Sequence, residues 1–159
     1  MSCDAIAFSA MLWLASSSPA PLPTAVPALS APASVAGEPL FADIVRRAGG
    51  LKLQVEAYRK ALAADPAAPA AALPGAEAFG ARIAELSALD MKGHLTLKER
   101  GAVDDLKCIL RGISVDLPEK LAAMTAARTV KDQDLALRDM VYLLNDNVEV
   151  ITAPPQPAA

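Results

Sequence analysis

Apolar residues between positions 41 and 62 recur at alternating intervals of three and four. This spacing keeps the side chains on one face of an α-helix, and its persistence over three repeats is typical of a coiled-coil seam. The 41–62 seam consists of Phe41, Ile44, Ala48, Leu51, Val55, Tyr58 and Leu62. Gly49 and Gly50 do not change its phase, so we predict one continuous helix that begins after Pro39 and ends before Asp65-Pro66.

A Pro- and Ala-rich linker over residues 66–75 follows this helix. Phe79, Ile83 and Leu86 then give a second predicted helix one apolar face. We expect it to end at Gly93, because glycine suits the left-handed conformation found at many helix ends. His94 would then lie in a surface turn.

Two capping signals predict a third and a fourth helix between residues 96 and 128. Thr96 is followed three residues later by Glu99, which is a capping box, and Gly112 suits the C-terminal end of that helix. Asp116 and Pro118 mark the start of the next helix, because proline is tolerated in a first turn.

The last predicted helix follows Thr129, which marks a break or a new N-cap. Its stripe consists of Leu137, Val141, Leu144 and Val148 at intervals of four, three and four residues. We expect this helix to end near Asn145–Asn147. A short extended piece and a Pro-rich tail follow.

Together these elements predict an all-α protein, an antiparallel bundle of four or five helices, because short connections join antiparallel neighbours in such bundles. The helical domain spans residues 39–151. A disordered Pro/Ser/Ala-rich linker, residues 29–38, precedes it, and the tail spans residues 152–159.

Residues 1–28 form a signal peptide or an apolar leader. The apolar run Ala5–Ala15 has the length of a signal-peptide core and is too short to span a bilayer as a helix. A signal peptide predicts a periplasmic or secreted protein. No Lys or Arg precedes Arg46, however, and a signal peptide ordinarily begins with positive charge, so a cytoplasmic location stays open as the alternative.

Charge and motifs argue against several classes of function. The chain has 15 basic and 18 acidic residues, a net charge of −3, which gives no basic face for nucleic acid. One histidine and scattered acidic residues supply no catalytic, cofactor-binding or metal-binding motif, which argues against an enzyme.

Loss of the leader would leave one cysteine, Cys108, which we expect to be a buried small apolar residue. Arg46-Arg47 could bind an anion, although exposed helix-face charge is the ordinary explanation.

These observations predict an exported, non-enzymatic helical interaction or scaffold protein without a cofactor or an integral membrane span. The 41–62 seam is its candidate interface with a protein partner or a second copy, unless the seam packs within its own chain. The alternative is a carrier whose bundle encloses a small apolar ligand, with Tyr58, Met140 and Tyr142 as candidate lining residues.

Overall fold

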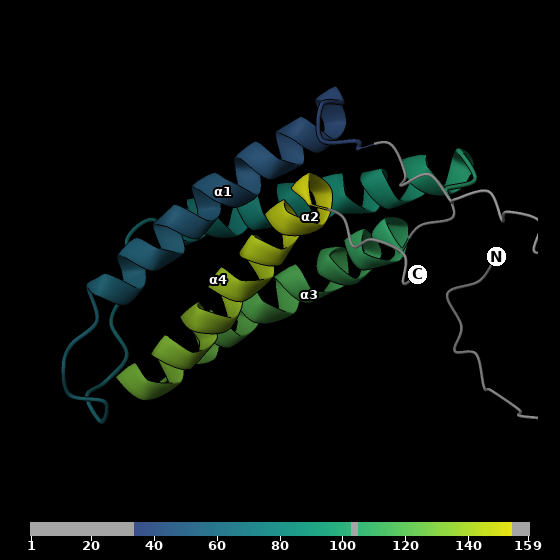
Figure 1. Ribbon diagram of the computed structural model, residues 1–159. Coiled ribbons are helices and arrows are strands. Elements are labelled where there is room, and N and C mark those ends of the chain that lie inside the picture. The colour runs from purple at the N-terminus through teal and green to yellow at the C-terminus, as the bar shows by residue number, and fades with distance from the viewer. Residues whose placement is uncertain (1–33, 103–104, 154–159) are drawn as a thin grey trace, which may run out of the picture. The chain divides into compact units, whose positions relative to one another are not determined.

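Four α-helices account for most of the residues that the computed structural model describes, which are residues 34–102 and 105–153 (Figure 1). They are α1 (Pro39–Lys60), α2 (Ala76–Glu99), α3 (Leu106–Ala126) and α4 (Val130–Thr152). Each helix packs against two others, in the cyclic order α1, α2, α3, α4. Within this part of the chain, the only β-type pairing is an isolated bridge between Pro69 and Thr129. The predicted all-α bundle is therefore confirmed, with four helices.

Bonds between α1 and α4 show that these two neighbouring helices run in opposite directions. The side chain of Lys52 in α1 donates to Asn145 in α4. Further along α1, Arg59 donates to Asp134, which lies earlier in α4 than Asn145 does. The predicted leader, residues 1–28, lies outside the described residues, as do residues 29–33 of the predicted linker and residues 154–159 of the tail.

All four helices bury a face that repeats every three or four residues. In α1 the buried face is the predicted 41–62 seam, with Leu62 half-buried just beyond the helix end. The buried residues of the other helices are Phe79, Ile83, Leu86, Asp90, Gly93, His94 and Leu97 in α2, Leu106, Leu110, Ile113, Ser114, Leu117 and Met124 in α3, and Val130, Gln133, Ala136, Leu137, Met140, Leu144, Asn147 and Ile151 in α4.

Helix α1 continues without a break through Gly49 and Gly50, as the unbroken phase of the seam predicted. Glycine in a helix interior costs about 1 kcal/mol relative to alanine. A Cβ added at either position would meet no atom within 4 Å, so packing does not require glycine there.

Helix α2 continues past Gly93 to Glu99, so the predicted end at Gly93 and the predicted N-cap at Thr96 are both wrong. A Cβ at Gly93 would lie 3.1 Å from a methyl group of Leu110 and 3.3 Å from the ring of Phe41. Glycine is present there because α1 and α3 approach α2 closely. The left-handed glycine that follows this helix is Gly101, at φ 69°.

Helix α3 is also longer than predicted, because it contains Pro118 and does not stop at Gly112. Proline has no N–H to donate to the carbonyl four residues earlier, which here belongs to Ser114. The hydroxyl of Ser87 in α2 donates to that carbonyl oxygen at 2.6 Å. A side chain from the neighbouring helix thus replaces the missing backbone bond. Cys108 lies in the first turn of α3 and is half-buried, so the expectation that it is buried is wrong.

Thr129 is the N-cap of α4, as predicted, and its hydroxyl oxygen accepts from the backbone N–H of Asp132. The predicted stop at Asn145–Asn147 is wrong, since α4 continues to Thr152 and buries Asn147 completely. Both Gln133 and Asn147 occupy positions of the buried repeat, where a search for apolar residues misses them.

The α1–α2 linker, residues 61–75, is bonded to the start of α4. The N–H groups of Val130 and Lys131 donate to the carbonyl oxygens of Ala68 and Pro66 at 2.9 and 3.0 Å. The side-chain amide of Gln133 both accepts from the N–H and donates to the carbonyl of Ala71. The linker therefore satisfies N–H groups that a helix N-terminus leaves without partners, and it is held in place by doing so.

We predict that the bond from Ser87 compensates for Pro118. Ser87→Ala should lower the free energy of unfolding by about 1 kcal/mol, because it leaves the Ser114 carbonyl without its donor. In a Pro118→Ala background the same change should cost less, because residue 118 then supplies its own N–H. Urea unfolding of the four variants of this double-mutant cycle measures the difference, and equal costs in both backgrounds would contradict the assignment.

Candidate functional site

Asp90 and Asn147 form a polar pair inside the bundle. Asp90 belongs to α2 and Asn147 to α4, which are not neighbours in the ring of helices. Both side chains are fully buried, and the amide nitrogen of Asn147 donates to Asp90 Oδ2 at 2.9 Å. This bond therefore connects two opposite helices through the interior.

Burial raises the pKa of Asp90 from 3.8 to about 7, and the hydrogen bond from Asn147 only partly opposes this rise. The Oδ1 atoms of both residues have no hydrogen-bond partner in the structure. A neutral Asp90 carboxyl carries an O–H that can donate, and the amide oxygen of Asn147 is an acceptor on the adjoining side chain. A protonated acid paired with an amide would satisfy both oxygens, which favours the neutral form of Asp90 in the folded protein.

His94 lies one turn beyond Asp90 in α2 and is 8% exposed, so its predicted position in a surface turn is wrong. Its Nδ1 atom lies 2.6 Å from the carbonyl oxygen of Lys107 in α3. Because a carbonyl only accepts, Nδ1 carries the hydrogen. This bond ties α2 to the start of α3. Among the described residues, no three His, Cys, Asp or Glu side chains gather where they could hold a metal ion.

The 41–62 seam lies in the interior of its own bundle. The residues Phe41, Ile44, Ala48, Leu51, Val55 and Tyr58 are buried, and Leu62 is half-buried. In this structure the seam therefore packs against other helices of its own chain. Pairing of the seam with another chain stays a prediction and requires α1 to leave α2 and α4.

The three candidate lining residues of a ligand cavity are not brought together. Met140 is fully buried, whereas Tyr142, two residues later in α4, is 62% exposed on a different face. Tyr58 contacts the ring of Phe79 edge-on, and its hydroxyl donates to the carbonyl oxygen of Pro74 at 2.7 Å. Tyr58 thus anchors the end of the α1–α2 linker.

Leu135 is an exposed leucine on the first half of α4 that lines two hollows. One hollow, of about 480 Å³, is formed by α3 and α4 and is lined by Ala123, Ala126, Ala127, Arg128, Asp132, Leu135, Ala136 and Asp139. The other, of about 420 Å³, is formed by the end of α1, the linker and α4 and is lined by Arg59, Leu62, Ala63, Ala64, Pro66, Val130, Lys131, Asp134 and Leu135. We call these residues together the Leu135 surface.

Sequence reasoning missed Asp90, Asn147 and Leu135. The spacing alone could have found the two polar residues, because each continues the interval of three or four set by the apolar residues of its helix. Leu135 lies off the stripe of α4, and an apolar residue off the stripe is a weak signal by itself.

None of the described helices combines the length and the hydropathy that crossing a membrane requires. Comparison of the chain with protein-family models, with curated proteins and with solved structures gives no significant match.

We predict that Asp90 makes the stability of the bundle depend on pH. Its pKa is higher in the folded chain than in the unfolded one, so the folded state binds more protons between about pH 4 and pH 7, and stability should fall as pH rises through that window. The loss is on the order of 4 kcal/mol for a shift of about three units. Asp90→Asn keeps the shape of the neutral acid and should remove this loss, which makes the variant more stable than wild type at about pH 8.

Thermal unfolding at a series of pH values measures this effect. Asp116→Asn is the matched control, because Asp116 is exposed on α3 and the substitution makes the same change in charge. An Asp90→Asn profile parallel to that of wild type would contradict the prediction.

Proposed function

We propose that this chain is an exported, non-enzymatic helical interaction protein that binds a partner protein through the Leu135 surface. The observation that supports this proposal most directly is an exposed leucine with a hollow on either side. Leu135 is 39% exposed and contributes to the walls of both hollows.

The occupant that fits this surface best is an amphipathic helix of the partner. The lining of the hollow between α3 and α4 includes the small side chains of Ala123, Ala126 and Ala136, which let another helix approach closely. Two hollows separated by one ridge suit two apolar side chains spaced along one helix face. Anchors of this kind, filling pockets, carry most of the binding energy in protein interfaces.

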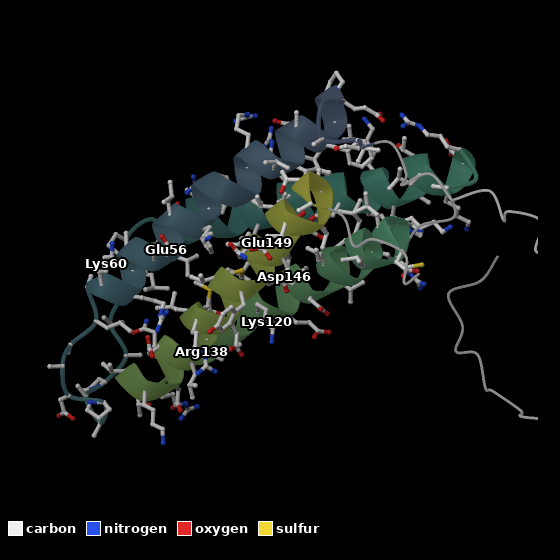
Figure 2. All side chains as sticks on the ribbon, viewed as in Figure 1. Glu56, Lys60, Lys120, Arg138, Asp146 and Glu149 are labelled. Carbon is white, nitrogen blue, oxygen red and sulfur yellow. The ribbon has the colours of Figure 1, made fainter. Side chains whose placement is uncertain are left out.

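Ion pairs around the hollows supply a polar rim. Arg59 and Asp134 pair at 2.9 Å beside one hollow. Beside the other, Asp139 lies 3.7 Å from the ammonium of Lys120 and 3.3 Å from the guanidinium of Arg138, both labelled in Figure 2. An apolar centre with a charged rim is the usual anatomy of a protein interface.

The alternative is a carrier of a small apolar ligand. The hollows favour binding of a partner protein over this alternative. Each described hollow opens to the surface at the junction of two or more elements, and the large apolar residues of the interior pack into one continuous core. A carrier would bury most of its ligand in an apolar pocket.

We predict that Leu135→Lys weakens partner binding by about tenfold or more, because it replaces the apolar side chain between the two hollows with a charged one. Leu53→Lys is the matched control, since Leu53 is 68% exposed on α1 and lines neither hollow. Proteins retained from native host extract by wild type and Leu53→Lys, but not by Leu135→Lys, are then purified for direct titration.

Circular dichroism checks that both variants remain folded. Light scattering of the purified protein distinguishes a second copy from a different partner, because self-association through this surface would be lost only in Leu135→Lys. Equal titration curves for the two variants would remove the Leu135 surface from the proposal.

Export is tested separately by the mature N-terminus. We predict that intact mass of the native protein shows loss of about 20–31 residues, the length of an ordinary signal peptide. The apolar run Ala5–Ala15, followed by small residues, motivates this expectation. A cytosolic product that retains Met1 or Ser2 would contradict it.

A further inference from the structure

Three arginines surround a hollow between α1 and α2. The hollow has a volume of about 210 Å³, and its lining consists of Arg46, Arg47, Gly50 and Leu51 from α1 and Arg82 from α2. Without a third arginine, the adjacent Arg46 and Arg47 would be explained as ordinary charged residues on the face of a helix. The fold adds a third guanidinium from another helix and a concave surface between them.

Arg47 is held in place from two sides. Its Nε donates to Asp43 Oδ2 and its Nη1 to Glu85 Oε2, both at 2.8 Å. The hydrogen bond from Arg47 holds the pKa of Asp43 below its ordinary value, so this carboxylate stays charged through neutral pH. These bonds leave Nη2 of Arg47 for a ligand, on a guanidinium that is already oriented.

The other two arginines are also positioned by bonds that leave donors for a ligand. Arg82 donates through Nη2 to the side-chain oxygen of Gln54 and through Nε to the carbonyl of Ala78. Arg46 donates to the second oxygen of Asp43. Three guanidinium groups face two carboxylates, so the side chains around the hollow carry one net positive charge on a chain whose net charge is −3.

Gly50 is the one lining residue of the hollow that has no side chain. Its lack of a side chain weakens α1, and no neighbouring atom requires that lack, since the space beyond it is open. A methyl group at this position would add bulk to the lining of the hollow. The hollow therefore has no side chain at the Gly50 position of its lining.

We propose that this hollow, which we call the arginine hollow, binds a phosphate-type oxyanion, either free phosphate or the phosphate of a monoester. Planar guanidinium groups donate pairs of hydrogen bonds that match phosphate oxygens, and their prior fixation lowers the entropy lost on binding. The volume of about 210 Å³ is enough for a phosphate group. The arginine hollow shares no lining residue with the Leu135 surface.

The test is a titration of the full chain with sodium phosphate at constant ionic strength, followed by nitrogen–proton NMR. Wild type should show saturable shifts of the Gly50 amide and of the Nε–H groups of Arg47 and Arg82, all with one dissociation constant. Arg82→Gln should raise that constant by about tenfold or more. Arg111→Gln, an equal change in charge at an exposed position of α3, should leave it unchanged.

A pair of glycine variants tests the Gly50 position of the lining without a change in charge. Gly49→Ala and Gly50→Ala should stabilise α1 to a similar extent, because an added Cβ meets nothing at either position. Only Gly50→Ala should weaken phosphate binding. Shifts that do not saturate, that sodium chloride reproduces, or that persist equally in Arg82→Gln would overturn the proposal, and so would identical binding by the two glycine variants.

The source of the phosphate is resolved with vesicles. Vesicles of phosphatidylcholine with added phosphatidic acid, compared with phosphatidylcholine alone, test a lipid headgroup. Retention on the acidic vesicles that Arg82→Gln abolishes assigns the phosphate to a lipid. Phosphate binding without vesicle retention assigns it to a small soluble ligand.

Discussion

The structure depends on the burial of four helix faces against one another. Each face repeats at intervals of three or four residues, and the apolar side chains on it form one continuous core across all four helices. The close approach at Gly93, where α1 and α3 meet α2, is possible only because no side chain stands there. Pro118 lies within α3 under the same constraint, because Ser87 is close enough to replace the lost backbone bond.

Polar residues within these faces set the register of the helices. Asp90 and Asn147 link α2 to α4, and Gln133 links α4 to the α1–α2 linker through both atoms of its amide. A slip of either helix by one turn would separate these partners and leave buried polar groups without hydrogen bonds, which costs more than the bonds themselves contribute. Apolar residues alone tolerate several registers, so the polar pairs distinguish the observed packing from its neighbours.

The sequence predicted the fold class, the 41–62 seam and the N-cap at Thr129, because each depends on local spacing or on one helix terminus. It misplaced the ends of α2 and α3, because Gly93 and Pro118 are locally typical of helix ends and are accommodated only by contacts with other helices. The arginine hollow could not be predicted from the sequence for a similar reason. Arg82 lies 35 residues after Arg47, and only the pairing of α1 with α2 brings the two into one lining.

The two proposed surfaces share α1 but no residue. The arginine hollow uses the middle of α1 with α2, whereas the Leu135 surface uses the end of α1 with the linker, α3 and α4. Ligands at both places bind the folded chain, so each should raise its stability by mass action. Coupling between them would require a difference in structure that both ligands detect. The seam of α1 is buried from Phe41 to Tyr58, and a close-packed core resists small displacements. The physical expectation is therefore that the two surfaces bind independently, and that a partner held at the Leu135 surface leaves the affinity of the arginine hollow unchanged.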